Sequence, residues 1–404
     1  MRGWFFLFLF ASAFAKASPP LFIFPKTGLA PEDLAVVVND ADPASVITAE
    51  YYQSRRHIPD ANMIHVRFPH DSPELTPAEF AAVKAEVDRK TPNSVQAFAL
   101  AWTSPYRAGC MSITSAFAFG FDRAYCSHCG KTRANPYYDS ASIMPYRDMH
   151  IRPAMMLAGK NVDSVKSLID RGISSDESHP PGTGYLLATS DKARNVRAPG
   201  FPQAIRTDGP WVKLKMLEQD SIKDSHDILF YFTGLASVPY LDTLRFLPGA
   251  MADHLTSTGG MLTGSGQMSI LRWLDAGATA SYGTVVEPCN YPQKFPNPGI
   301  AIYWYVQGES LIEAYWKSVA WPGEGLFVGE PLANPFRGQH VRMEGDEVVL
   351  DILSLSPGLY ALFGADAVVG PYSPEHLTIR VLPGKNEFRL GRLQKPIYRV
   401  IRVP

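Results

Sequence analysis

Three apolar runs decide the expected fold of this chain: ILFYFTG at residues 228–234, AMADHLTS at 250–257 and ATASYGTVVEPC at 278–289. Each run stops abruptly in small, polar or reactive residues, and α/β proteins carry their chemistry at strand ends of this kind. If the runs are neighbouring parallel strands, their carboxyl ends share one edge of a sheet. The segment from Asp227 to Phe336 therefore predicts a site as well as a sheet.

The amino-terminal part of the chain predicts more of the same sheet. Strands expected at residues 34–38, 63–68 and 95–102 alternate with helices expected at 44–56 and 76–90. Asp42 can cap the first of these helices, with Pro43 in its first turn, where a missing N–H costs nothing. The alternation favours an α/β fold, with a mostly parallel sheet and helices on both faces. We expect another strand at 184–189 and further helices at 162–171, 211–218, 267–276, 299–306 and 309–319.

Two regions depart from this alternation. Residues 104–152 are rich in Tyr, Ser, Arg and Cys and have no sustained period, so we expect a long loop or an elaborated insertion. Loops of that length are usually functional or cross-linked. Short runs at 340–343, 347–352, 358–363, 377–381 and 387–390, separated by Gly or Pro, predict a small all-β sandwich over 338–404.

The chain begins with the pattern of an export signal. Met1-Arg2-Gly3 precedes an apolar stretch that is too short to span a bilayer, which predicts a signal peptide over 1–17 and an α/β domain over 18–337. No later segment is apolar enough for a transmembrane helix, so we expect export to the periplasm or the extracellular space. The formal net charge of -1 and the pI near 6.8 offer nucleic acid no electrostatic footprint.

The four cysteines are Cys110, Cys126, Cys129 and Cys289. In an oxidising compartment one or two disulfides are the simplest expectation, although the sequence does not fix their pairing. The CxxC at 126–129 also has the spacing of a redox motif or a zinc knuckle, and the other candidate zinc ligands are Cys110, His128 and His150. We expect no other cofactor.

The strand ends carry the candidate chemistry. An imidazole beside a thiol can accept its proton and lower its pKa, so His254 with Cys289, or with Ser257, is a candidate catalytic set. The alternative is a disulfide at Cys289 and a structural role for His254. Gly234 and Glu287 would face the same crevice as substrate-binding residues.

Two other places are candidates for ligand binding. Asp40 lies in a carboxylate-rich turn at a strand end, which would suit a cation or a substrate amine, although helix capping explains its neighbour Asp42 without a ligand. Arg147 belongs to an aromatic and arginine-rich stretch of the insertion. Such stretches recognise sugars, peptides or carboxylates, but an Arg–Asp pair can also simply pin a loop.

Several short strings taken together resemble an exported bacterial family of unknown function. The strings are NDADP (39–43), YY (51–52), RHIP (56–59), PGA (248–250), HLTS (254–257), GATA (277–280) and GTVVEP (283–288). The resemblance covers about residues 20–337, is specific only as a combination, and implies no established activity.

A more distant resemblance is to the caspase-like fold of gingipain-type cysteine peptidases, which carry an immunoglobulin-like domain after the catalytic one. It rests on the order of a Thr-Gly turn (233–234), a Ser-Thr-Gly-Gly turn (257–260), a Gly-Ala strand and the string GEPL (329–332). In that fold the catalytic His follows the glycine after one strand, and the Cys ends the next. Here Leu235 follows Gly234, and the second strand ends at His254. The resemblance implies the architecture, but not a standard dyad.

Two functions remain open from the sequence. The first is a hydrolase of peptide or amide bonds with a site rearranged around His254. The second is a non-catalytic exported protein on a degenerate peptidase-like fold, which binds a peptide, a glycan or an envelope component through residues 104–152.

Overall fold

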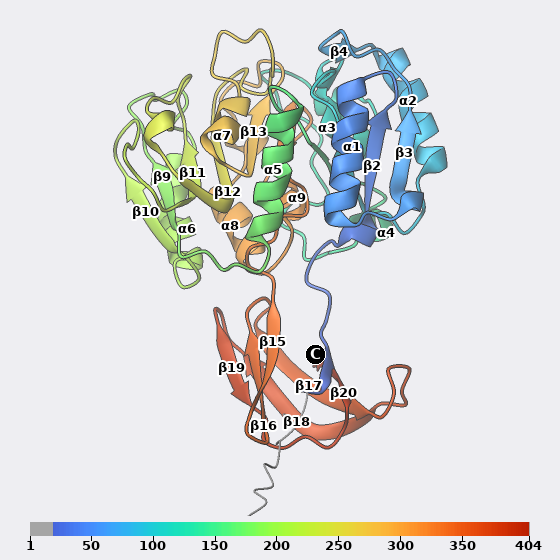
Figure 1. The fold of residues 1–404 in the computed structure, drawn as a ribbon. Helices are drawn as coiled ribbons and strands as arrows, with labels where there is room; N and C mark the ends of the chain where they lie inside the picture. Colours follow the sequence, from blue (N-terminus) through green and yellow to red (C-terminus); the bar gives the residue numbers. More distant parts are fainter. Residues whose placement is uncertain (1–18, 404) are drawn as a thin grey trace, which may run out of the picture. The chain divides into compact units, whose positions relative to one another are not determined.

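The computed structural model describes residues 19–403, so the signal peptide expected over 1–17 lies outside the described residues. The chain divides into two compact units (Figure 1). The larger unit comprises Lys26–Gly338 with Leu353–Ser356. The smaller one comprises the described residues up to Pro25, Gln339–Ile352 and the residues from Pro357 onward.

The larger unit is built on a ten-stranded, mostly parallel sheet in the order β10-β9-β11-β12-β13-β14-β8-β5-β2-β3. The strands are β2 (Leu34–Asn39), β3 (Met63–Val66), β5 (Ala97–Leu100), β8 (Ala154–Met156), β9 (Thr183–Leu187), β10 (Lys213–Leu217), β11 (Ile228–Thr233), β12 (Phe246–His254), β13 (Ala280–Thr284) and β14 (Gly325–Gly329). The three runs that decided the expected fold are β11, β12 and β13, which are parallel neighbours, while β14 runs antiparallel to β13. The predicted common edge of the sheet is confirmed.

Helices cover both faces of this sheet. They are α1 (Pro43–Arg56), α2 (Pro77–Lys90), α3 (Ile113–Phe119), α4 (Pro145–Met149), α5 (Val162–Ser175), α6 (Phe201–Asp208), α7 (Leu271–Ala276), α8 (Pro298–Val306) and α9 (Leu311–Lys317). The side chains of β2 alternate between two core clusters. Val36 and Val38 belong to the core cluster that includes residues of α1, α6, α8 and α9, whereas Ala35 and Val37 belong to the cluster that includes residues of α2 and α3. The expected α/β class is therefore correct.

The predicted Asp42 cap is confirmed, and the structure adds a second cap that was not predicted. Asp42 Oδ1 accepts a hydrogen bond from Ala44 N at 2.9 Å at the start of α1. Thr76 and Glu79 form a reciprocal capping box at the start of α2. These caps satisfy backbone N–H groups that have no partner inside a helix.

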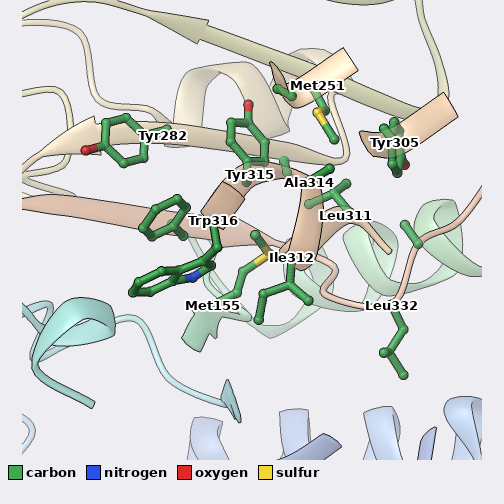
Figure 2. Packing of buried hydrophobic residues seen from close by; sticks show 14 of the residues in the cluster. Met155, Met251, Tyr282, Tyr305, Leu311, Ile312, Ala314, Tyr315, Trp316 and Leu332 are labelled. Atoms are coloured by element: carbon green, nitrogen blue, oxygen red, sulfur yellow. The ribbon is translucent and has the colours of Figure 1, made fainter. Parts of the chain in front are cut away.

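The core of the first face is centred on α9 (Figure 2). Tyr315 and Trp316 are fully buried there, with Met155 of β8 and Met251 of β12. The Trp316 ring stacks on Phe327 with centroids 4.5 Å apart, and its Nε1 donates to the carbonyl oxygen of Ala154 at 2.9 Å. A buried indole needs such a partner for its N–H, so this contact fixes α9 against the sheet.

Two expected elements were wrong. The helix expected at 211–218 is the edge strand β10, which pairs with β9 and alternates charged Lys213 and Lys215 with apolar Leu214 and Met216. The helix expected to stop at Gly172 continues to Ser175. Gly172 lies against the side chain of Glu330 with no room for a Cβ, so the glycine serves close packing rather than helix termination.

The insertion at 104–152 is folded rather than an irregular loop. It contributes β6 (Arg107–Ala108), β7 (Met111–Ser112), α3 and α4. β4 (Glu74–Leu75), β6 and β7 form a small sheet of their own. Phe117 and Tyr137 of the insertion are at most 1% exposed, so the insertion supplies part of the core.

The smaller unit consists of short strands. One sheet has the order β1-β20-β17-β18 and the other has the order β15-β16-β19. The strands are β1 (Leu21–Ile23), β15 (Gln339–Glu344), β16 (Glu347–Ile352), β17 (Gly358–Ala365), β18 (Ser373–Val381), β19 (Asn386–Arg389) and β20 (Ile397–Arg402). The sequence pattern predicted five of these strands but missed β1 and β20, which pair in parallel with each other.

Candidate functional site

A cavity of about 290 Å³ lies where the carboxyl ends of β12 and β13 meet the loop after β9. We call it the strand-end crevice, and its lining includes Arg194, Thr256, Ser257, Glu287, Cys289 and Phe295. The parallel pairing of β9, β11, β12 and β13 brings these loops to the same edge. Three of the predicted site residues, Ser257, Glu287 and Cys289, therefore do come together.

His254 is buried beneath this edge, with 1% of its surface exposed. Its Nδ1 accepts a hydrogen bond from Trp273 Nε1 at 2.9 Å. Since an indole N–H can only donate, the imidazole proton must be on Nε2, which lies 3.1 Å from the carbonyl oxygen of Met268. Burial lowers the pKa of His254 to about 3, so the ring stays neutral. Both ring nitrogens are therefore hydrogen-bonded within the protein.

Cys289 is joined to Cys129 in a disulfide, and Cys110 is joined to Cys126. The expected disulfides are therefore present, and the second one ties the insertion to the loop after β13. While it is intact, Cys289 has no thiol proton for His254 to accept, and the structure does not assemble these two residues as base and nucleophile. The zinc alternative is wrong, because every cysteine sulfur is used in a disulfide rather than available as a thiolate.

Arg194, which the sequence did not single out, supplies the positive charge of the crevice. Its Nη1 pairs with Asp191 Oδ2 at 2.8 Å and its Nε donates to Thr256 Oγ1 at 3.1 Å. Within residues 19–403, its Nη2 makes no hydrogen bond, and the side chain is 26% exposed. The signal that could have found it is its position in the loop after a predicted strand at the same sheet edge.

Two further groups in the crevice are open to a ligand. Among the described residues, the Ser257 hydroxyl makes no hydrogen bond, although the Ser257 carbonyl oxygen accepts one from Thr284 Oγ1 at 2.8 Å. Glu287 is exposed and uses Oε1 to accept the backbone N–H of Cys289 at 2.8 Å, and among the described residues its Oε2 accepts no hydrogen bond. The crevice thus offers a guanidinium, a hydroxyl and a carboxylate oxygen.

A buried ion pair fixes the walls of the crevice. Arg197 Nη2 lies 2.7 Å from Asp253 Oδ1, and both side chains are at most 4% exposed. The same guanidinium donates to the carbonyl oxygens of Thr233 and Pro296, at 2.6 and 3.1 Å. Burial raises the pKa of Asp253 to about 6, while Arg197 opposes that rise. One side chain therefore connects the loop after β9 with β11, β12 and the segment before α8.

The other predicted binding residues lie elsewhere. Gly234 is buried directly beneath the carbonyl group of Arg194, so it supports that loop rather than facing a ligand. Asp40, at the end of β2, pairs with His65 Nδ1 at 2.7 Å. Arg147 pairs with Asp148 at 2.8 Å, in the short exposed helix α4. Neither Asp40 nor Arg147 lines the crevice.

Comparisons with known proteins add one finding. No family model matches the chain, and no curated protein matches it. A solved structure titled "Structure of Protease" aligns with 92% of this chain and 97% of that chain at 10% identity, with a TM-score of 0.42. A likeness at that score does not indicate a function. No helix among residues 19–403 is long and apolar enough to cross a membrane.

Proposed function

We propose that this chain is an exported, non-catalytic binding protein on a caspase-like fold, and that it takes the anionic group of a ligand into the strand-end crevice. The proposal rests on the bonding of the expected catalytic pair, His254 and Cys289. Both nitrogens of His254 are bonded within the protein, and Cys289 is in a disulfide. The two disulfides also support export to an oxidising compartment, in agreement with the expected signal peptide.

Arg194 makes an anion the best ligand chemistry for this site. It is the sole Lys or Arg among the described lining residues, and its Nη2 is open. A guanidinium presents planar donors that match a carboxylate, and partial burial strengthens the attraction by excluding water. Ser257 lines the same cavity and could donate a further hydrogen bond to the anion.

A binding measurement tests the proposal. Calorimetry on the oxidised full chain would use glucuronate and N-acetylglutamate as probes, with glucose as the uncharged counterpart of glucuronate. We expect the Arg194→Ala variant to bind both carboxylates at least about tenfold more weakly, a loss of about 1.4 kcal/mol. Arg55→Ala is the control, because Arg55 is another solvent-accessible arginine paired with an aspartate and lies outside the crevice. Equal affinities in the two variants would contradict the proposal.

The second candidate is a hydrolase of peptide or amide bonds. The observation that favours it is an open Ser257 hydroxyl in the same crevice as the Glu287 carboxylate, which could accept the serine proton. Wild type and the Ser257→Ala variant would be compared on a broad panel of peptide and amide substrates. Turnover by wild type that disappears in the variant would replace the binding proposal, and no turnover by wild type would remove the hydrolase.

A further inference from the structure

A second cavity, of about 210 Å³, adjoins the strand-end crevice, because Phe295 lines both. We call it the Tyr138 cavity. Its walls come from the segment before α8, the loop after α9, residues 196–200 after β9 and Tyr138 of the insertion. The stretch around Tyr138 was a candidate for recognition by its composition alone, and the proposed function does not use it.

The Tyr138 cavity has both polar and apolar walls, and the one charged residue in its described lining is paired. Tyr138 is 37% exposed, and its pKa is raised by burial and lowered in part by a hydrogen bond with the side chain of Asn297. Asn297 Oδ1 caps α8 by accepting the Gly299 N–H at 3.0 Å. Gln293 contributes a second side-chain amide to the lining. Arg197 is the sole charged residue among the described lining residues, and Asp253 neutralises it.

Most backbone carbonyl groups around the Tyr138 cavity already accept hydrogen bonds within the protein. The carbonyl oxygens of seven lining residues accept hydrogen bonds from within the protein: Pro292, Gln293, Pro296, Asn297, Arg197, Ser318 and Ala320. Three lining residues are prolines and have no N–H to donate: Pro292, Pro296 and Pro298. A bound peptide relies on main-chain hydrogen bonds, so this wall is poorly suited to one. A ligand here would pair mainly with side-chain amides and hydroxyls.

We propose that the two cavities form one binding site for an acidic oligosaccharide. The carboxylate of an acidic sugar pairs with Arg194 in the strand-end crevice, and an adjoining neutral sugar occupies the Tyr138 cavity. Sugar hydroxyls both donate and accept, as the phenol and amide groups of this cavity do. The apolar face of a sugar ring packs on an exposed aromatic side chain, and Tyr138 supplies one here, whereas Phe295 is only 2% exposed. This inference rests on the proposed function of the crevice.

The test compares a glucuronate–N-acetylglucosamine disaccharide with glucuronate alone, by calorimetry on the oxidised full chain. We expect the disaccharide to bind at least about tenfold more tightly, because it fills both cavities. Tyr138→Ala should reduce its affinity to that of glucuronate. Asn297→Asp, which keeps the helix-capping oxygen but replaces the amide donor, should also weaken it. Tyr240→Ala is the control, because Tyr240 is 54% exposed and lines neither cavity.

The outcomes separate the two proposals. A disaccharide that binds no more tightly than glucuronate, or whose affinity is unchanged in Tyr138→Ala, overturns the oligosaccharide site. If glucuronate binding still depends on Arg194 in that case, the crevice proposal stands. If the acidic peptide acetyl-Glu-Ala-Tyr-amide binds more tightly than the disaccharide and responds to the same variants, the ligand is a peptide and the inference is wrong. Thermal midpoints of every variant within a few degrees of wild type establish that folding is intact.

Discussion

Replacing Arg56 should destabilise the larger unit far more than replacing its neighbour Arg55. Both arginines are at the end of α1 and both pair with carboxylates at α5, which lies alongside α1 (Figure 1). Arg55 Nε lies 3.0 Å from Asp170 Oδ1, and both side chains are nearly half exposed. The Arg56 side chain is 8% exposed and pairs with both Asp176 and Glu330. The two sites differ mainly in burial.

The magnitude follows from what Arg56→Ala would leave behind. The Glu330 side chain is fully buried and takes two hydrogen bonds from Arg56, one of them from Nε at 3.0 Å. Without Arg56 its carboxylate would keep the Tyr52 hydroxyl at 2.7 Å and the Leu332 N–H at 3.3 Å, but no cation. Breaking a buried pair from one side costs about 3–5 kcal/mol. An exposed pair such as that of Arg55 contributes about 0–1 kcal/mol.

Urea unfolding at pH 7 would measure both variants through tryptophan fluorescence. Every tryptophan except Trp4 lies in the larger unit, so the signal reports this unit. We expect a loss of about 3–5 kcal/mol for Arg56→Ala and less than about 1 kcal/mol for Arg55→Ala, with similar m-values. A loss below about 1 kcal/mol for Arg56→Ala, or equal losses in both variants, would refute the reasoning.

Four further predictions concern two other buried groups and the disulfides. Burial raises the pKa of Asp208 to about 7. The folded chain therefore binds more protons than the unfolded chain between about pH 4 and 7, and wild type loses stability as the pH rises through that window. The Asp208→Asn variant has no carboxyl group to ionise at this buried position. The unfolding free energy of the variant minus that of wild type should therefore be larger at pH 8 than at pH 5. Trp273→Phe should lower the free energy of unfolding by about 1–3 kcal/mol, because it leaves Nδ1 of buried His254 without a hydrogen-bond donor. Urea unfolding measures this loss, and an unchanged midpoint would contradict that hydrogen bond. Thiol titration should find no thiol before reduction and four after reduction in denaturant. Replacing both Cys129 and Cys289 by Ser should cost up to about 5 kcal/mol in the chain-entropy model for a separation of 160 residues.

The sequence predicted the sheet edge well, because apolar runs that stop in polar residues reflect a local property of each strand. The three runs became β11, β12 and β13, and Asp42 caps α1 as expected. The chemical state of the edge depends on distant partners. His254 Nδ1 accepts a hydrogen bond from Trp273, which lies 19 residues further along the chain, on α7. Cys289 is in a disulfide with Cys129, which lies 160 positions away. No local pattern contains either pairing.

Edge strands and side-chain pairings were missed for the same reason. β10 is a strand because β9 supplies its hydrogen bonds, and its short sequence alone also fitted a helix. Arg194 lines the crevice because the parallel register of β9 and β11 brings its loop to this edge of the sheet, which no local pattern predicts. The strings behind the family resemblance also gained a physical meaning. Tyr52 and Arg56, which belong to two of those strings, form one buried cluster with Glu330, which lies 274 positions beyond Arg56 along the chain.

The insertion at 104–152 must be tested by substitution rather than by deletion, because it is part of the core. Phe117 is 1% exposed and packs edge-on against Phe80, with ring centroids 5.3 Å apart. Phe117→Ala should therefore cost about 3–5 kcal/mol in urea unfolding. Tyr138, 21 positions later, is 37% exposed, so Tyr138→Ala should cost less than about 1 kcal/mol while weakening the disaccharide. If a chain lacking residues 104–152 stayed soluble and unfolded cooperatively with wild-type stability, the insertion would be an appendage. Tyr138 would then not be held in position by the core, and the Tyr138 cavity would not be a preformed site.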